Sequence, residues 1–431
     1  MGLGILSTIK PMVPIGIVIA CVFLGLRAMT GKLEWTLMLL IFLLPMRNVV
    51  EKLHSYPLGK DLIDIIFISM LIGLVTQAMA KKKKIFERSP LNGICVFLIL
   101  YTFASLLYGS IYLNEYSIFS LSGPRTQVWK NYCMLPLLYI ITLNSIKEKK
   151  WVWITVFVMC FTIFLMDYYM IRQVRWFYTI EAREKIKGTF VYLGPNEVAA
   201  FYNQYTIVLM SLFFAMKRNW KKLALAGIIA MNLYSILFLY SRAAYVAFAI
   251  GMFFLFAIRK KILLIPLVLV VVMWQTFLPG LVKERIEMTT NVYGELDESS
   301  ERRIMVWQDS LELFNESPLI GVGFGVFRFM GFNLGDTHNI YLKILAEQGL
   351  VGITIFLILL IVLFIQGMKL YANGDEPLSK ALGLGFTISI IVLILNNMFG
   401  DRWTYIEVSS FLWVFAALVT RLNILTEKRV D

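Results

Sequence analysis

The sequence predicts an all-α polytopic membrane protein with about 12–14 transmembrane helices and a long external loop that carries two short amphipathic helices. Its mean hydropathy of +0.73 and its hydrophobic content of 59% are too high for a soluble protein. Apolar runs of the length needed to cross a bilayer recur along the chain, and basic clusters fall in every second loop between them. Residues 1–431 therefore form a single transmembrane domain, without a polar segment long enough to fold alone.

Thirteen apolar runs predict the individual spans. They cover residues 11–28, 33–46, 61–80, 91–110, 129–145, 151–170, 196–216, 223–240, 243–258, 262–280, 350–369, 380–399 and 404–420. The first two runs are short and contain proline. No small-residue cleavage site follows the first run, so we expect no cleavable signal peptide.

The basic loops predict the orientation of these spans. The positive-inside rule places the basic loops in the cytoplasm, together with the C-terminus at Glu427-Lys428-Arg429. The loops concerned contain Lys81–Lys84 with Arg88, Lys147/Lys149/Lys150, Lys217/Arg218/Lys221/Lys222 and Arg259/Lys260/Lys261. The segment 281–349 then faces outward. The net charge of +13 reflects this topology and does not indicate nucleic-acid binding.

Cysteine and histidine usage argues against a metal site. All four cysteines lie in apolar runs, where they act as small buried hydrophobic residues. The only two histidines, His54 and His338, are far apart and have no cysteine cluster near them, which argues against zinc. We expect neither a metal nor a cofactor.

The external segment 281–349 contains the first amphipathic helix. Ser299 or Ser300 can cap it, and it runs to Ser317-Pro318. Its predicted apolar stripe should pack on the outer membrane surface or on neighbouring spans, and consists of Ile304, Trp307, Leu311 and Phe314. Arg302 and Arg303 lie in the first turn, where positive charge opposes the helix dipole unless an anion binds between them and the helix start.

A glycine-rich stretch and a second helix follow. Gly321-Val322-Gly323-Phe324-Gly325 predicts a tight re-entrant turn, because its spacing does not fit a nucleotide loop. Asp336 or Thr337 can cap the second helix, His338 lies in its first turn, and Gly349 can end it. The dipole at this helix start disfavours imidazolium, so we expect a neutral His338 that can accept a proton from a hydroxyl.

Several of these segments resemble the O-antigen ligase and O-antigen polymerase superfamily of bacterial glycosyltransferases. The similar stretches occur in the expected order over about residues 188–352. They are Gly188-Thr189-Phe190 through Pro195-Asn196, Ser241-Arg242-Ala243-Ala244, Arg303-Ile304-Met305-Val306-Trp307, Ser317-Pro318-Leu319-Ile320-Gly321-Val322-Gly323, and His338-Asn339-Ile340-Tyr341-Leu342 with Glu347-Gln348-Gly349. The sequence departs from the family pattern at Ala243 and before Arg303, where glycine is common.

The resemblance implies a multi-pass protein of the bacterial cytoplasmic (inner) membrane with an outward-facing active site. Such proteins take a glycan from undecaprenyl pyrophosphate and pass it to a hydroxyl of a lipid-linked glycan or of the lipid A–core, and other polysaccharide-assembly proteins can be partners. They are thought to act without metal and with inversion at the anomeric carbon. Ligase and polymerase are not separated by the sequence.

This chemistry assigns provisional roles to the candidate residues. Arg242 and Arg303 would stabilise the leaving pyrophosphate, and His338 would act as general base. Further substrate-binding candidates are Arg302, Arg172, Arg175, Asn339 and Tyr341. Arg242 could instead anchor its helix at the membrane interface, and His338 could instead be a helix-cap side chain. For Glu347 we expect a structural role.

Two other classes of function compete with the transferase. Many spans and basic residues also suit a transporter or a flippase for lipid-linked oligosaccharides, although we find no internal repeat of the kind that transporters show. A non-catalytic scaffold for polysaccharide assembly is the third reading.

Overall fold

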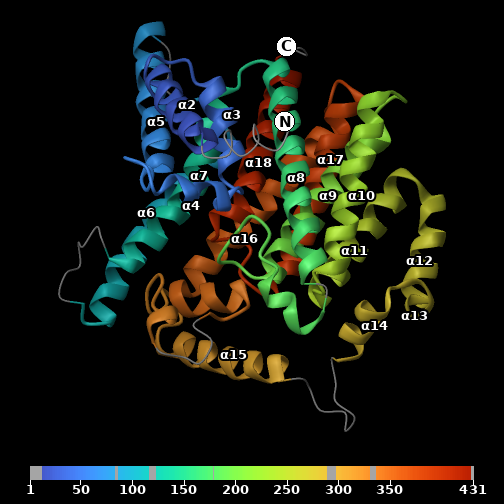
Figure 1. Cartoon of the computed structure of the whole chain (residues 1–431). Helices are drawn as coiled ribbons and strands as arrows, with labels where there is room; N and C mark the ends of the chain where they lie inside the picture. The colour runs from blue at the N-terminus through green and yellow to red at the C-terminus, as the bar shows by residue number, and fades with distance from the viewer. Residues whose placement is uncertain are drawn as a thin grey trace.

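The computed structural model describes residues 12–82, 86–115, 123–177, 179–288, 298–330 and 336–428. These residues form helices and connecting segments without a β-strand, which confirms the predicted all-α polytopic fold (Figure 1). Within them, nine helices are long and apolar enough to cross a membrane: α5, α6, α8, α9, α10, α11, α16, α17 and α18.

The helices have the following bounds, in chain order. They are α2 (Met12–Met29), α3 (Glu34–Leu43), α4 (Arg47–Leu53), α5 (Leu62–Lys81), α6 (Pro90–Tyr112), α7 (Pro124–Ser145), α8 (Lys149–Trp176), η1 (Glu181–Lys185), α9 (Pro195–Ala215), α10 (Trp220–Phe238), α11 (Arg242–Arg259), η2 (Lys261–Leu263), α12 (Leu264–Val272), α13 (Trp274–Phe277), α14 (Gly280–Glu287), α15 (Glu298–Glu316), η3 (Phe327–Phe329), α16 (Ile340–Asn373), α17 (Pro377–Asn397) and α18 (Ile406–Glu427).

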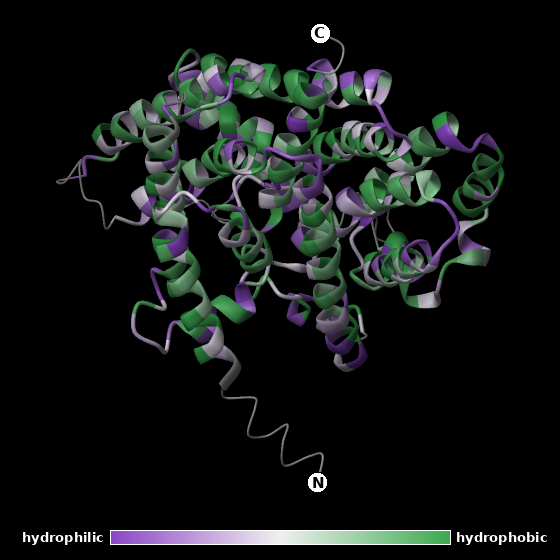
Figure 2. Cartoon of the chain, turned by 90° about the horizontal axis from the view of Figure 1, so that it is seen from above, coloured by the Kyte–Doolittle hydropathy of each residue, from purple (hydrophilic) through white to green (hydrophobic). Residues whose placement is uncertain are grey.

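Three helices form the centre of the bundle. In α9, α17 and α18 the shares of buried residues in the most apolar stretch are 83%, 72% and 89%, whereas the same share is 28% in α10. The outer helices expose large apolar side chains, such as Phe157 and Phe161 of α8. Figure 2 shows that hydrophobic residues dominate the helices at the edge of the molecule. Exposed apolar side chains on these helices fit contact with lipid.

Some of the connections predicted to share one side of the membrane lie at one end of the bundle, whereas the α11–α12 connection lies nearer the middle of the molecule. Figure 1 places the α7–α8, α9–α10 and α16–α17 connections and the C-terminus at the same end. Lys149 at the start of α8 pairs with Asp375 between α16 and α17, at 2.7 Å. Lys428 after α18 approaches Glu87 before α6, at 3.4 Å. α15 lies across the opposite end.

Two predicted spans form shorter pieces. The run 33–46 gives α3, which is 10 residues long, and the run 262–280 is divided among η2, α12, α13 and α14. The nine residues of α12 rise only about 13 Å, which is less than half of a hydrocarbon core. Pro279 helps to cause this division, since it has no N–H to donate within a continuous helix and it separates α13 from α14.

The contact face of α15 differs from the predicted stripe. Val306, Ser310 and Leu313 are buried, whereas Ile304 and Leu311 are 41% and 45% exposed. The prediction that Ile304 and Leu311 belong to the packed stripe was therefore wrong. The small Ser310 lies on the inward face, and Val306 and Leu313 join an apolar cluster with Val322, Val326, Phe327 and Ala346. Ser299 and Ser300 lie within the helix rather than before it, so neither is its cap.

The second predicted amphipathic helix is the first part of α16. Gly349 has non-helical angles (φ 62°, ψ −161°), so α16 consists of two helical parts on either side of this residue. The prediction that the first part ends at Gly349 fits this kink. The second part then continues as a membrane span.

The glycine-rich turn packs between α6 and α16. The backbone N–H of Gly323 donates to the carbonyl of Glu347 at 2.9 Å, and that of Phe324 donates to Ser105 at 3.1 Å. Gly323 has φ +120°, and a Cβ placed there would lie 2.2 Å from Gly109 Cα. The turn can therefore approach α6 this closely only with glycine at this position.

We expect Gly323→Ala to destabilise the protein by about 2–5 kcal/mol, because backbone strain and a clash with backbone atoms act together. Thermal unfolding in detergent measures the effect as a lower midpoint. Gly93→Ala in α6 is the matched control, since a Cβ there meets no atom within 4 Å. An unchanged midpoint for Gly323→Ala would contradict the close packing.

Candidate active site

Five arginines line one cavity at the end of the bundle where α15 lies. The cavity has a volume of about 190 Å³, and a single carboxylate, Glu184, is among its lining residues. Its arginines come from η1, α11, α14, α15 and the α17–α18 connection, and are Arg183, Arg242, Arg285, Arg303 and Arg402. Such an excess of guanidinium groups suits an anion with several oxygens, such as a diphosphate.

A hydrogen bond from α15 brings Arg303 beside His338. Trp307 Nε1 donates to the carbonyl oxygen of Thr337 at 3.1 Å. Arg303 precedes Trp307 by four residues and therefore shares its side of the helix. The Arg303 guanidinium is close enough to affect the titration of His338. The four-residue spacing therefore lets Trp307 hold the segment before His338 while Arg303 faces the same side of α15.

His338 lies outside the second helix rather than in its first turn. Its φ is +49°, and the N-cap is Asn339, whose Oδ1 accepts from the backbone N–H of Tyr341 at 3.0 Å and of Leu342 at 3.3 Å. The predictions of a cap at Asp336 or Thr337 and of His338 in the first turn were wrong, because a residue in the left-handed region cannot belong to the helix. Thr337 instead donates its hydroxyl to the Asn339 carbonyl at 2.8 Å.

The surroundings of His338 favour the neutral imidazole. Burial lowers the pKa of His338; Asp336 opposes this effect, and the charges of Arg303 and Arg402 lower the pKa further. The expected neutral form thus follows from burial and nearby arginines more than from a helix dipole. A neutral imidazole near bound phosphate can accept a proton from a hydroxyl.

The sequence did not single out three of the pocket arginines, Arg183, Arg285 and Arg402. Arg402 is 4% exposed, and its Nη1 donates to Glu197 Oε1 at 2.5 Å. Arg183 is 6% exposed, and its Nη2 donates to Asn196 Oδ1 at 2.9 Å. The Nε atoms of both arginines are buried without an acceptor among the described residues. Asn196, the partner of Arg183, belongs to the family-like stretch that ends in Pro195-Asn196, so this stretch could have pointed to Arg183. Arg402 lies outside every stretch that resembles the family.

The further substrate-binding candidates do not line this pocket. Arg302 is exposed on α15, and Arg172 lies over the Tyr168 ring with its Cζ 5.8 Å from the centroid. Arg175 is also exposed. Tyr341 donates its hydroxyl to the Ile394 carbonyl at 2.9 Å, and it lines an apolar groove together with Asn339.

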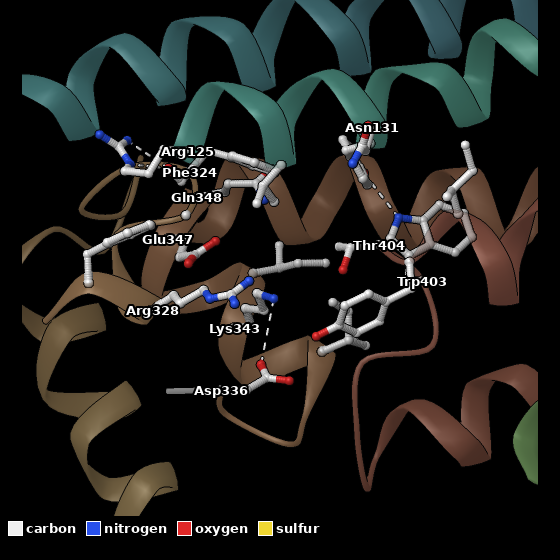
Figure 3. A pocket seen from close by; sticks show the side chains of 18 of the residues that line it. Arg125, Asn131, Phe324, Arg328, Asp336, Lys343, Glu347, Gln348, Trp403 and Thr404 are labelled. Atoms are coloured by element: carbon white, nitrogen blue, oxygen red, sulfur yellow. Dashed lines mark hydrogen bonds and ion pairs between the residues drawn. The ribbon is translucent and has the colours of Figure 1, made fainter. Parts of the chain in front are cut away.

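A second, larger cavity has a volume of about 450 Å³ and is shown in Figure 3. The ammonium group of Lys343 lies 2.9 Å from Asp401 and 3.6 Å from Asp336. Burial alone would raise the pKa of Asp401, but Lys343 and hydrogen bonds from Thr404 outweigh burial and lower it. The buried carboxylate of Glu347 accepts from the backbone N–H of Phe327 at 3.2 Å, as fits its expected structural role.

One short segment lies between the cavities, and a second one carries His338 beside the larger cavity. Asp336 lines the larger cavity, while His338, two residues on, is influenced by Arg303 and Arg402 of the arginine pocket. Likewise Arg402 lines the arginine pocket, and the next residues, Trp403 and Thr404, line the larger cavity. Residues 402–405 thus form a shared wall, and His338 lies in the segment 336–340, which borders the larger cavity.

These features define a polytopic membrane protein with an arginine-lined pocket at one end of its helical bundle. Residues 225–357 match the family model described as O-antigen ligase, which confirms the resemblance inferred from the motifs. The matched segment includes Arg242, Arg285, Arg303 and His338, but neither Arg183 nor Arg402.

A curated relative supports the same resemblance. The exopolysaccharide production protein ExoQ of Rhizobium meliloti (strain 1021) is 24% identical over 148 residues. The aligned part covers 31% of this chain and 33% of that protein, so the chain spans about a third of the length of the relative it matches.

Proposed function

We propose that this protein is a membrane glycosyltransferase of the ligase or polymerase type. It moves a glycan from undecaprenyl pyrophosphate to a hydroxyl of a lipid-linked acceptor, either a lipid-linked glycan or the lipid A–core. The observation that carries this proposal is the convergence of five arginines on one pocket, with an imidazole of lowered pKa beside it.

The arginine pocket serves the leaving group. When the bond between the anomeric carbon and the pyrophosphate oxygen breaks, the pyrophosphate gains negative charge. Arg242 and Arg303 stabilise this charge through the fork geometry of their guanidinium groups, and Arg183, Arg285 and Arg402 add to the positive field. Cations held in place before the reaction lower the barrier without further reorganisation.

His338 serves the nucleophile. The acceptor hydroxyl oxygen forms the new bond to the anomeric carbon and gives its proton to the neutral imidazole. Attack opposite to the departing pyrophosphate inverts the configuration of that carbon. The protonated His338 then returns its proton to solvent before the next cycle.

The proposed location is the bacterial cytoplasmic membrane, with the arginine pocket outward and the C-terminus in the cytoplasm. The reason is that the basic α7–α8 and α9–α10 connections and the C-terminal end of α18 lie at the end of the bundle opposite to α15. A cysteine introduced into the α15 region should react with a membrane-impermeant thiol reagent in whole cells whose outer membrane has been permeabilised.

The defining experiment uses purified protein and a lipid-linked glycan with its acceptor. We expect release of undecaprenyl pyrophosphate, a product of inverted configuration and an unchanged rate with a metal chelator. Movement of the intact lipid-linked glycan across vesicles, without cleavage, would instead show the flippase. A decrease in rate with chelator would refute metal-independent catalysis.

The pH dependence of transfer should report His338. Its base form is lost as the pH falls through its pKa, which lies below the usual value of about 6.5. We therefore expect the rate to stay high at pH 6.5 and to fall only at lower pH. Initial rates between about pH 5 and pH 8 test this. In His338→Gln, the residual rate should lack the acid limb; an acid limb centred above about 6.5 in the parent protein would contradict the proposed environment.

A further inference from the structure

We propose that the larger cavity binds the saccharide portion of the acceptor, on the opposite side of the shared wall from the leaving pyrophosphate. This inference rests on the proposed glycosyl transfer and identifies which substrate the second cavity takes. The cavity volume of about 450 Å³ falls within the range of about 300–1,000 Å³ that is usual for ligand pockets.

The charge of the larger cavity distinguishes its ligand from a diphosphate. Three cationic and three acidic side chains line it, whereas five arginines and one glutamate line the other pocket. Most of these charges have partners. Lys343 lies beside Asp401 and Asp336, and the Glu407 carboxylate accepts from the Tyr192 hydroxyl. A ligand without concentrated charge, but with many hydroxyl groups, suits this balance.

The same cavity presents free hydrogen-bonding groups and aromatic surface together. Arg328 is exposed, lines the cavity and makes neither a hydrogen bond nor an ion pair within the described part of the chain. Figure 3 shows its guanidinium on the cavity side, near Glu347 and Lys343. Asn131 of α7 is likewise exposed and has no hydrogen bond within that part. Phe329 and Tyr192, which are 43% and 50% exposed, add apolar ring surface. Sugars offer both C–H faces and hydroxyl groups to such a lining.

The geometry of substitution selects the acceptor rather than the donor. In an inverting displacement the nucleophile approaches from the side opposite to the leaving group. The leaving pyrophosphate belongs to the arginine pocket, and the base, His338, stands between Asp336 and Ile340, which both line the larger cavity on the other side of the shared wall. The saccharide that carries the attacking hydroxyl then extends into the cavity beyond this wall, the one lined by Asp336 and Thr404.

Two substitutions test this cavity without removing a contact of the fold. Arg328→Gln and Asn131→Ala change side chains that have no partner among the described residues. The probes are two sets of short oligosaccharides, obtained by partial acid hydrolysis of the surface polysaccharide and of the lipopolysaccharide core of the source strain, so that both proposed acceptors are represented. Ligand-observed NMR titration of the full-length protein in detergent measures their binding, and inorganic pyrophosphate is titrated in parallel.

We expect the oligosaccharides to bind the parent protein and to bind the double variant roughly tenfold more weakly, with pyrophosphate binding unchanged. Arg242→Gln should give the reverse pattern, and the exposed Arg218→Gln at the other end of the bundle should change neither. In transfer assays, the double variant should raise KM for the acceptor and leave kcat and the donor KM unchanged.

The outcomes separate the two proposals. Oligosaccharides that fail to bind, or bind the double variant as well as the parent, overturn the acceptor cavity while transferase activity stands. A parent protein that cleaves no lipid-linked glycan refutes the proposed function itself. A double variant with a higher KM for the donor alone would assign the cavity to the donor glycan and overturn the inference.

Discussion

Replacing His338 with alanine should reduce the rate of glycan transfer by about 10²–10⁴-fold, the range typical for loss of a general base. The basis is the imidazole itself, which is half-buried, favours the neutral form and lies next to the arginine pocket. Assays at saturating donor and acceptor should show the decrease in kcat. Binding of inorganic pyrophosphate should persist in this variant, because the five arginines remain in place.

His338→Gln provides the control for shape. Glutamine keeps a polar side chain of similar size but cannot act as a base near neutral pH, so it should be nearly as slow as alanine. Both variants should unfold at a temperature close to that of the parent protein, since the neighbouring cap is made by Asn339. Full activity of either variant would remove the base from the mechanism.

Arg303→Ala should lower kcat by about 10²–10³-fold, the usual effect of removing one preorganised electrostatic stabiliser. Arg303 lines the pocket and affects the titration of His338, so its loss also permits a higher pKa at that histidine. Arg303→Lys should recover only part of the rate, because an ammonium group cannot reproduce the two-pronged contact with phosphate oxygens. Rates and pyrophosphate affinity, measured together, test both effects.

Arg302→Ala is the matched comparison for this prediction. Arg302 is the preceding residue on α15 but is exposed and lies outside the pocket lining. Its removal should therefore have a much smaller effect than removal of Arg303. Equal losses of activity from the two substitutions would contradict the orientation of α15 in which only Arg303 of this pair faces the pocket.

The sequence predicted the all-α fold because bilayer-length apolar runs and alternating basic loops are strong, local signals. It also brought Arg242, Arg303 and His338 to the same end of the bundle, through motifs whose order resembles one family. In the structure, Arg242 and Arg303 line one cavity, and His338 lies close enough for Arg303 to affect it.

Other features depend on packing that local patterns do not encode. The contact face of α15 includes the polar Ser310, which an apolar stripe cannot reveal. Arg402 lies about 100 residues after Arg303 and is positioned by its contact with Glu197, which only the assembled bundle creates. The role of His338 as a residue before the cap required the observed left-handed backbone.

The arginines of the pocket differ in how firmly their elements are held, and the hydrogen bond between Trp307 and Thr337 belongs to the weakly held side. Arg402 is held to α9 through Glu197, next to the most buried helices of the protein. Arg303 instead belongs to α15, which the described residues hold through the Trp307–Thr337 hydrogen bond, a hydrogen bond from the Tyr112 hydroxyl to Glu316 and a small apolar cluster. Segments with few buried contacts open at the lowest free energy. In the proposed transfer reaction, α15 is thus the side of the pocket that can move away at the lowest free energy to admit a lipid-linked glycan, while the helical bundle keeps its packing.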